Sequence, residues 1–258
     1  PVICAPLFRW LLETRGWQPT FMIIGAVIGV ILFVFSLFIH NSPADKGLKP
    51  YGAEDAGDLP EKPQAAAAKT AAPVNLRAIL GERTVWKLMG IHHIGCVSHA
   101  IILAHVVSMA TFNGIPGVQA ASILATIAGT SVISRFAFSV LAERMGGRRV
   151  LTISLLGQSL PVIILFFAYD AWVFYLFAIM FGLCYGGEMV GFPIINRQLF
   201  GAKAPLGSIY SFEMLGASTG MALGGWLGGM FFDVFASYHW ALMASLLIGL
   251  AGLPLTLS

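Results

Sequence analysis

Residues 131–151 read SVISRFAFSVLAERMGGRRVL and join a long apolar run to a cluster of basic residues. Arg135 stands alone among the apolar side chains, and three further arginines follow the run: Arg144, Arg148 and Arg149. This pattern is typical of a helix that crosses a membrane and ends at the cytoplasmic surface, where basic residues accumulate. Arg135 lies nine residues before Arg144. That spacing is about 14 Å along a helix, close to the middle of a roughly 30 Å hydrocarbon core.

The composition extends this interpretation to the whole chain. Of its 258 residues, 57% are hydrophobic and only 10% are charged, and the mean hydropathy is +0.82. In soluble domains, about a quarter of all residues are charged. Successive apolar runs are long enough to cross a membrane as helices, and the short alternating segments of outer-membrane strands do not occur. The sequence therefore predicts an all-α, polytopic transmembrane helical bundle.

Seven apolar spans are predicted after an apolar tail at residues 1–12, which we interpret as the end of an earlier span. They cover residues 17–39, 88–110, 118–141, 150–168, 171–195, 207–231 and 238–257. The chain opens with Pro1 and shows neither the basic leader nor the cleavage site of a signal peptide. We therefore expect a fragment whose N-terminal portion is missing.

A polar segment at residues 40–86 separates the first two spans. It is rich in Pro, Ala, Lys, Asp and Glu and has no hydrophobic periodicity, so it is predicted to be a flexible linker. Apolar residues recur at helical spacing over residues 74–89. This stretch is predicted to form a short amphipathic helix on the membrane surface.

The basic residues fall on alternate loops. Of the fifteen lysines and arginines, all but Arg9, Arg15 and Arg135 lie in the linker, next to it at Lys87, or in the loops that follow residues 141 and 195; Arg135 lies inside a span. The positive-inside rule places those segments in the cytoplasm, so we expect a multi-pass protein of the cell (inner) membrane with a cytoplasmic linker. The net charge of +3 does not indicate nucleic-acid binding, because the basic residues sit at helix ends.

Nothing in the sequence indicates an enzyme. No paired nucleophile and base, phosphate loop or convincing metal set appears. Cys4, Cys96 and Cys184 lie in apolar runs without metal-ligand spacing and are predicted to be packing residues. A metal site at the histidines is not expected either, because the sequence shows no carboxylate or thiolate at ligand spacing from them. We therefore predict neither cofactor nor metal.

Ionisable residues inside the spans are the candidate functional groups. Each costs at least about 2.5 kcal/mol at membrane depth and should face protein or a water-filled cavity. His92 and His99 share a helix face, and with Glu188 they are candidates for proton coupling, although the histidines could also be hydrogen-bonded packing residues. Glu188 and Arg135 lie at similar depth and could pair. Glu213 is shallower, which favours a structural or gating contact.

Glycines recur every fourth residue in the span 207–231. They are Gly216, Gly220, Gly224 and Gly228. On a helix this spacing forms a flat strip on which another helix can pack closely, so we predict that the strip is a helix-packing surface.

The segment SRFAFSVLAERMGGRRVL resembles the loop signature of the major facilitator superfamily, in which Gly, three residues, Asp-Arg, one residue and Gly precede basic residues. Ser139 occupies the position of the first Gly, and Glu143 occupies the position of the Asp. The other signature positions match at Arg144, Gly146, Arg148 and Arg149, with Gly147 as an extra residue. RGWQPTF and GGMFFDVFASYHWALM further resemble the monocarboxylate and oxalate/formate transporter branch.

This resemblance implies the C-terminal half of a twelve-helix fold plus helix six. Residues 1–39 would end the N-terminal half, residues 40–86 would be the linker, and residues 87–258 would form the C-terminal six-helix bundle. It also implies that Arg135, with Ser131 one turn earlier, binds a substrate carboxylate. The lysine of the oxalate type has no counterpart in the span 207–231.

We therefore expect a secondary transporter of small organic anions that works by alternating access, as a proton symporter or an anion exchanger. Its partners would be the anion, protons, the lipid bilayer and the missing N-terminal half, and not nucleic acid. One alternative is a carrier for another solute, such as a drug, sugar or osmolyte, in which Arg135 forms a structural ion pair with Glu188. Another is a membrane sensor or partner protein that transports nothing.

Overall fold

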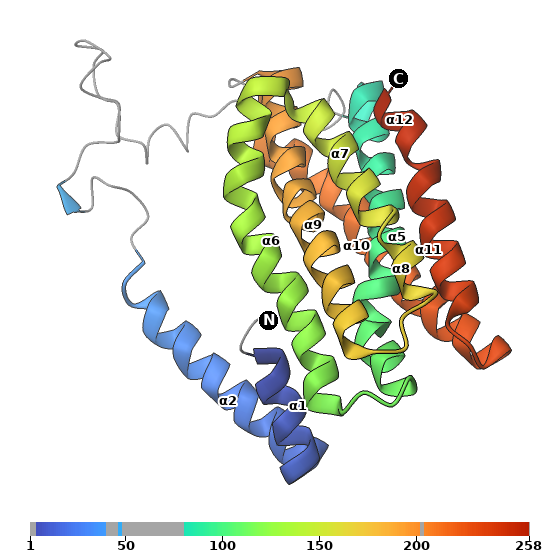
Figure 1. Ribbon diagram of the computed structural model, residues 1–258. Helices are drawn as coiled ribbons and strands as arrows, with labels where there is room; N and C mark the ends of the chain where they lie inside the picture. Colours follow the sequence, from blue (N-terminus) through green and yellow to red (C-terminus); the bar gives the residue numbers. More distant parts are fainter. Residues whose placement is uncertain (1–3, 40–45, 48–79, 202–203, 258) are drawn as a thin grey trace. The chain divides into compact units, whose positions relative to one another are not determined.

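The computed structural model describes residues 4–39, 46–47, 80–201 and 204–257, and its long elements are all helices (Figure 1). They are α1 (Cys4–Arg15), α2 (Trp17–Ser36), α5 (Arg83–Phe112), α6 (Gly117–Met145), α7 (Gly147–Ser159), α8 (Val162–Leu165), α9 (Ala171–Phe200), α10 (Leu206–Phe235), α11 (His239–Ala251) and α12 (Leu253–Leu257). The predicted all-α fold is confirmed.

The first two helices correspond to the apolar tail and the first predicted span. α1 ends at Arg15, and α2 begins at Trp17. Gly16 separates them with a φ of 77°, a conformation that glycine adopts without steric cost. Apolar side chains are exposed all round α2, as expected for a helix whose surroundings are apolar.

Helices α5 to α12 form a bundle in which every predicted span from residue 88 onward has a helical counterpart. α5 begins at Arg83 and is one continuous helix of 30 residues. The prediction of a separate surface helix is therefore wrong for residues 83–89, which are the first turns of α5. The rest of that predicted helix lies mainly outside the described residues.

Two of the predicted spans are interrupted, and one helix continues through a proline. α7 and α8 are separated at Leu160 and Pro161, and α11 and α12 are separated at Gly252. Pro193 lies inside α9, which continues to Phe200. A proline in a membrane helix is tolerated where neighbouring helices and local backbone adjustments accommodate the lost hydrogen bond.

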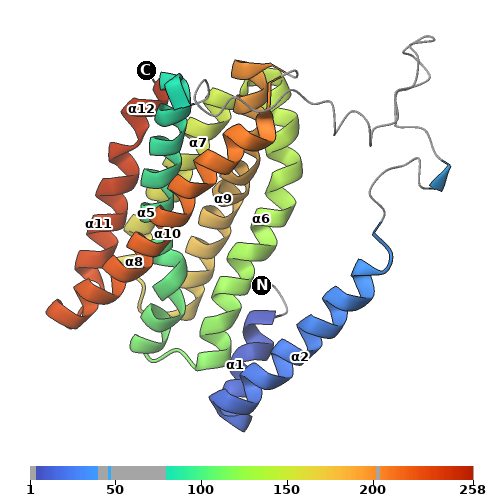
Figure 2. The ribbon, with the colours of Figure 1, turned by 180° about the vertical axis from the view of Figure 1, so that it is seen from behind.

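The helices of the bundle pack in a pattern that both ribbon views show. α10 lies along α5, α6 and α7 lie along α9, and α11 lies on another side of α5 (Figures 1 and 2). One apolar cluster includes Ile101, Ile127 and Phe177, and a second includes Leu88 and Phe192. His92 and His99 of α5 and Glu188 of α9 are buried and lie between these two clusters.

Within the described residues, six helical segments are long and apolar enough to cross a membrane. They are Trp17–Ser36, Arg83–Phe112, Gly117–Met145, Gly147–Leu165, Ala171–Phe200 and His239–Thr256. α10, predicted as the span 207–231, is as long as α5 but is not among them. Its many glycines make it less apolar, since a glycine contributes no side chain.

Candidate functional site

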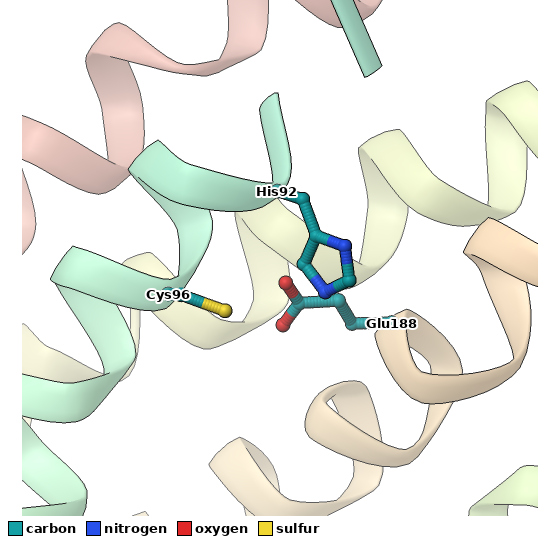
Figure 3. Close-up of side chains that lie close together, drawn as sticks. All are labelled: His92, Cys96 and Glu188. Carbon is teal, nitrogen blue, oxygen red and sulfur yellow. The ribbon is translucent and has the colours of Figure 1, made fainter. Parts of the chain in front are cut away.

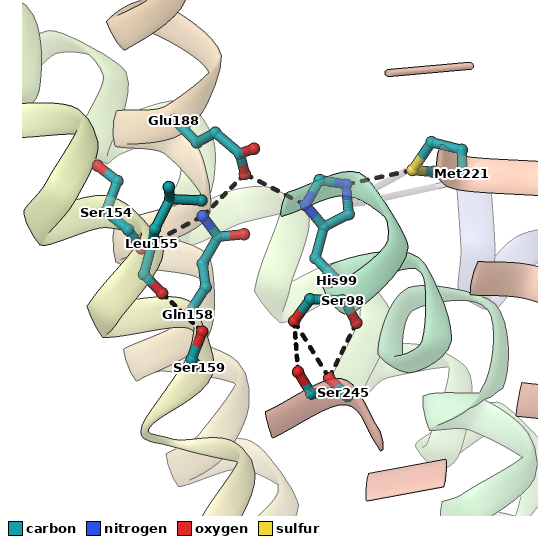
Figure 4. Close-up of polar contacts among 9 residues, drawn as sticks. All are labelled: Ser98, His99, Ser154, Leu155, Gln158, Ser159, Glu188, Met221 and Ser245. Atoms are coloured by element: carbon teal, nitrogen blue, oxygen red, sulfur yellow. Dashed lines mark hydrogen bonds and ion pairs between the residues drawn. The ribbon is translucent and has the colours of Figure 1, made fainter. Parts of the chain in front are cut away.

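Glu188 lies at the centre of the buried polar residues. It is on α9, and its side chain is 0% exposed. The carboxylate points toward His92 and Cys96 of α5 (Figure 3). Its Oε2 atom accepts a hydrogen bond of 2.8 Å from Nε2 of Gln158 on α7, while Oε1 has no hydrogen-bond partner (Figure 4). One oxygen is therefore fixed by the protein, and the other is available.

His99 on α5 is the ion-pair partner of Glu188. Its Nδ1 atom lies 3.2 Å from Oε2 of Glu188, and both side chains are buried. Its Nε2 atom lies 3.2 Å from the sulfur of Met221 on α10. The ring also meets Tyr185 edge-on, with centroids 5.1 Å apart. The imidazole therefore joins α5, α9 and α10 at one point.

Small residues give the helices the space to approach at this level. A Cβ atom on Gly95 of α5 would lie only 2.9 Å from Oε1 of Glu188. On α9, a Cβ atom on Gly186 would overlap Ser131 and Ser134 of α6, and one on Gly187 would overlap Ser154 of α7. Glycine at these positions therefore allows Glu188 to reach the centre of the bundle.

His92 and Cys96 lie one helical turn apart on α5 and face the same carboxylate. His92 stacks on Phe192 with ring centroids 3.8 Å apart, and its Nδ1 atom is buried without a hydrogen-bond partner. One ligand atom each from His92, Cys96 and Glu188 lies within 4.8 Å of the other two. The expectation that no thiolate or carboxylate lies near the histidines is wrong. Cys96 shares a face of α5 with His92, and helix packing brings Glu188 of α9 to both.

Arg135 and Ser131 differ in their surroundings although both are on α6. The Arg135 side chain is exposed. Among the described residues it forms no ion pair with Glu188, which is paired with His99 instead. The Arg135–Glu188 ion pair expected in one alternative is therefore not formed. Ser131 is buried against α9, and its hydroxyl donates to the carbonyl of Ala128 at 2.9 Å.

The residues of the loop signature surround the sharp turn from α6 to α7. Glu143 and Arg144 are exposed at the end of α6, and Gly146 makes the turn with a φ of 87°. Arg148 donates through Nε to the carbonyl of Thr256 at 2.6 Å, whereas Arg149 is exposed. The signature therefore holds the end of α12 against the beginning of α7.

The glycine strip of α10 faces α5. Gly216, Gly220, Gly224 and Gly228 are all buried. Their nearest neighbours are Met89, the His93 carbonyl, the Val97 carbonyl and the His105 ring, in that order. Near the start of α10, the buried Glu213 accepts a hydrogen bond of 2.8 Å from Asn196 of α9, which is a structural contact.

Three residues of this site were not identified from the sequence: Gln158, Cys96 and Met221. A glutamine inside an apolar span is a signal that could have been used, because a buried amide needs hydrogen-bond partners. Cys96 follows His92 by four residues and therefore shares its helix face. Met221 gives no such signal, since methionine is a common packing residue.

A bundle of long apolar helices with a buried ionisable centre is typical of a polytopic membrane transporter. Residues 100–257, more than half of the chain, match the family model of the Major Facilitator Superfamily. The chain belongs to that superfamily, and its general class is therefore that of a secondary transporter. A search of curated proteins gave no match.

Proposed function

We propose that this chain is the C-terminal part of a secondary transporter of small organic anions, with Arg135 as the binding group for a substrate carboxylate. The proposal rests on the position of Arg135 and on its charge, which is unpaired among the described residues. It is a cation in a membrane-spanning helix, it is exposed, and the buried Glu188 does not neutralise it. An arginine at the centre of such a helix costs roughly 2.5–3.5 kcal/mol, a cost that a bound anion would offset.

The chemistry of the guanidinium group favours a carboxylate as the ligand. The group is planar, always charged and able to donate two parallel hydrogen bonds to the two oxygens of one carboxylate. The resemblance to the monocarboxylate and oxalate/formate branch supports the same substrate class. Ser131 supports Arg135 indirectly, by packing α6 against α9, and does not itself contact the substrate.

Proton coupling would use the Glu188–His99 pair, with His92 beside it. The ring of Tyr185 contacts that of His99 edge-on. Binding an anion at Arg135 would change the electrostatic environment of that pair, which is the requirement for symport; an exchanger would need only the arginine.

Alternating access would arise from rocking of this bundle against an N-terminal half around a midplane site. The expected location is the cell membrane, with the linker in the cytoplasm. Apart from Arg135, the lysines and arginines of α5, α6, α7 and α9 support that orientation, because they lie at one end of the bundle.

Uptake of labelled small carboxylates into proteoliposomes tests the proposal. The full-length protein is compared with Arg135→Gln, and with Arg149→Gln as a matched control that removes an exposed arginine at the end of the bundle. We expect uptake by Arg135→Gln to fall at least about tenfold, since hydrogen bonds to charged groups contribute roughly 1.5–3 kcal/mol. An imposed inward proton gradient distinguishes symport from exchange.

The control variant should transport like the parent protein. Absence of carboxylate uptake by a folded parent would refute the proposed substrate class. Uptake that is equally strong in Arg135→Gln would show that another group binds the anion.

A further inference from the structure

We propose that His92, Cys96 and Glu188 form a binding site for a borderline-soft divalent cation such as Zn²⁺ inside the bundle. The site would bridge α5, which supplies the imidazole and the thiolate, and α9, which supplies the carboxylate (Figure 3). This site is distinct from Arg135, and cation binding there does not depend on which solute the protein transports.

The distances suit a single ion. The three ligand atoms all lie within 4.8 Å of one another. Bonds from Zn²⁺ to N, O and S ligands measure about 2.0–2.3 Å, so the ligand atoms of a tetrahedral site lie about 3.3–3.7 Å apart. Side-chain rotations that draw the three atoms together by about 1 Å would form the site. A water molecule would complete a tetrahedral set.

The free oxygen of Glu188 is the second observation that points to a cation. Glu188 is fully buried, and its Oε1 atom has no hydrogen-bond partner. Its Oε2 atom is held by Gln158 and His99. Ligating carboxylates are commonly oriented by such outer hydrogen bonds. The protein thus fixes one oxygen and leaves the other facing two further ligands.

The charge balance also fits a buried ion. The Cys96 thiol would lose its proton on binding, as metal-bound cysteines do. One thiolate, one carboxylate, a neutral imidazole and a divalent cation sum to zero net charge. A neutral complex avoids the large desolvation cost of an isolated charge in an apolar interior.

The ligand types select the class of ion. A thiolate and an imidazole favour Zn²⁺ and related transition metals, whereas Mg²⁺ and Ca²⁺ prefer sets made of oxygen alone. The site is also close to the surface of the bundle, because the half-buried Tyr210 lies with its ring only 6.5 Å from that of His92. Movement of this tyrosine would admit an ion.

A bound ion would hold α5 against α9 and occupy the oxygen that a coupled proton would use. If Glu188 serves proton coupling, as proposed above, Zn²⁺ would inhibit transport. That consequence rests on the proposed function. The binding measurement does not, so failure of one idea can be distinguished from failure of the other.

The test uses Co²⁺ as a spectroscopic probe for the Zn²⁺ site in the full-length protein, purified in detergent. A thiolate bound to Co²⁺ gives a charge-transfer absorption that imidazole and carboxylate ligands do not. We compare the parent with Cys96→Ser, His92→Gln and the matched control Cys184→Ser. Thermal unfolding and size-exclusion profiles verify that each variant is folded.

We expect the parent and Cys184→Ser to bind about one Co²⁺ with the thiolate absorption, and Zn²⁺ to displace it. Cys96→Ser should lose the absorption. His92→Gln should bind at least about tenfold more weakly, since even outer partners of a metal site contribute roughly 10–100-fold. A folded parent that binds no Co²⁺, or an absorption that survives in Cys96→Ser, would overturn the proposal.

Discussion

Glu188 is held through one carboxylate oxygen by two residues from two other helices, while its second oxygen remains free of hydrogen bonds. Placing an ionisable group in this way costs free energy, because the unpaired oxygen is removed from water. A buried oxygen without a hydrogen-bond partner calls for an explanation. The one we propose for Glu188 is that the carboxylate binds and releases a proton or an ion during a functional cycle.

We therefore predict that Glu188→Gln abolishes proton-driven accumulation of substrate while leaving substrate binding at Arg135. The amide keeps nearly the same shape but cannot take up a proton at neutral pH. The measurement compares uptake driven by a proton gradient with exchange between internal and external substrate in proteoliposomes.

Exchange should continue in Glu188→Gln, and Glu82→Gln, which changes an exposed carboxylate, should behave like the parent. Retained accumulation in Glu188→Gln would assign proton coupling to another group and remove Glu188 from the mechanism.

At the scale of the helices, the contact between α5 and α10 depends on the glycine strip. Gly224 lies directly against the Val97 carbonyl, and a Cβ atom there would also lie 2.8 Å from the Cβ of Ala100. Gly225, the next residue, has only Ala104 nearby, at 3.9 Å from such an atom. The two glycines are adjacent in the sequence, but only Gly224 is packed closely against α5.

Gly224→Ala should therefore destabilise the bundle by about 1–3 kcal/mol, the usual cost of overpacking. Gly225→Ala should be neutral or slightly stabilising, since alanine favours helix over glycine by up to about 1 kcal/mol. Thermal unfolding in detergent, followed by tryptophan fluorescence, measures both. Equal stability of the two variants would show that α10 does not pack closely on α5 at this position.

At the scale of the whole bundle, the basic residues of the helix ends gather at one end. The turns that contain Arg144 to Arg149, the end of α9 and the start of α5 lie together, next to the end of α12 (Figure 1). The opposite end contains Asn113 and Asp170, and its connecting segments contain no lysine or arginine. This asymmetry is the basis for the predicted orientation.

Single cysteines test that orientation in cells, in a background where native cysteines are replaced by serine. Asn113→Cys should react with a membrane-impermeant maleimide added outside, and Arg149→Cys should react only after the membrane is permeabilised. Both positions are exposed, so access depends on the side of the membrane. The reverse pattern would contradict the proposed orientation.

The helices and several of the candidate residues followed from local rules. Apolar runs of sufficient length predicted the helices, and the cost of a charge in an apolar run identified Arg135, Glu188 and His99. The pairing among them did not follow. The similar depth of Glu188 and Arg135 in the membrane suggested that the two could pair. Depth does not show how each helix is rotated about its own axis, and the structure pairs Glu188 with His99.

The sequence was sufficient to establish an all-helical membrane protein, its superfamily signature and the short list of ionisable groups, because each depends on residue type and on spacing along one helix. The partners of those groups depend on which helix faces which. His99 and Glu188 are separated by 89 residues, and close contacts at glycines such as Gly95 and Gly186 set their approach. Such contacts arise only when the helices pack, so the joining of His92, Cys96 and Glu188 into one site is a property of the folded bundle.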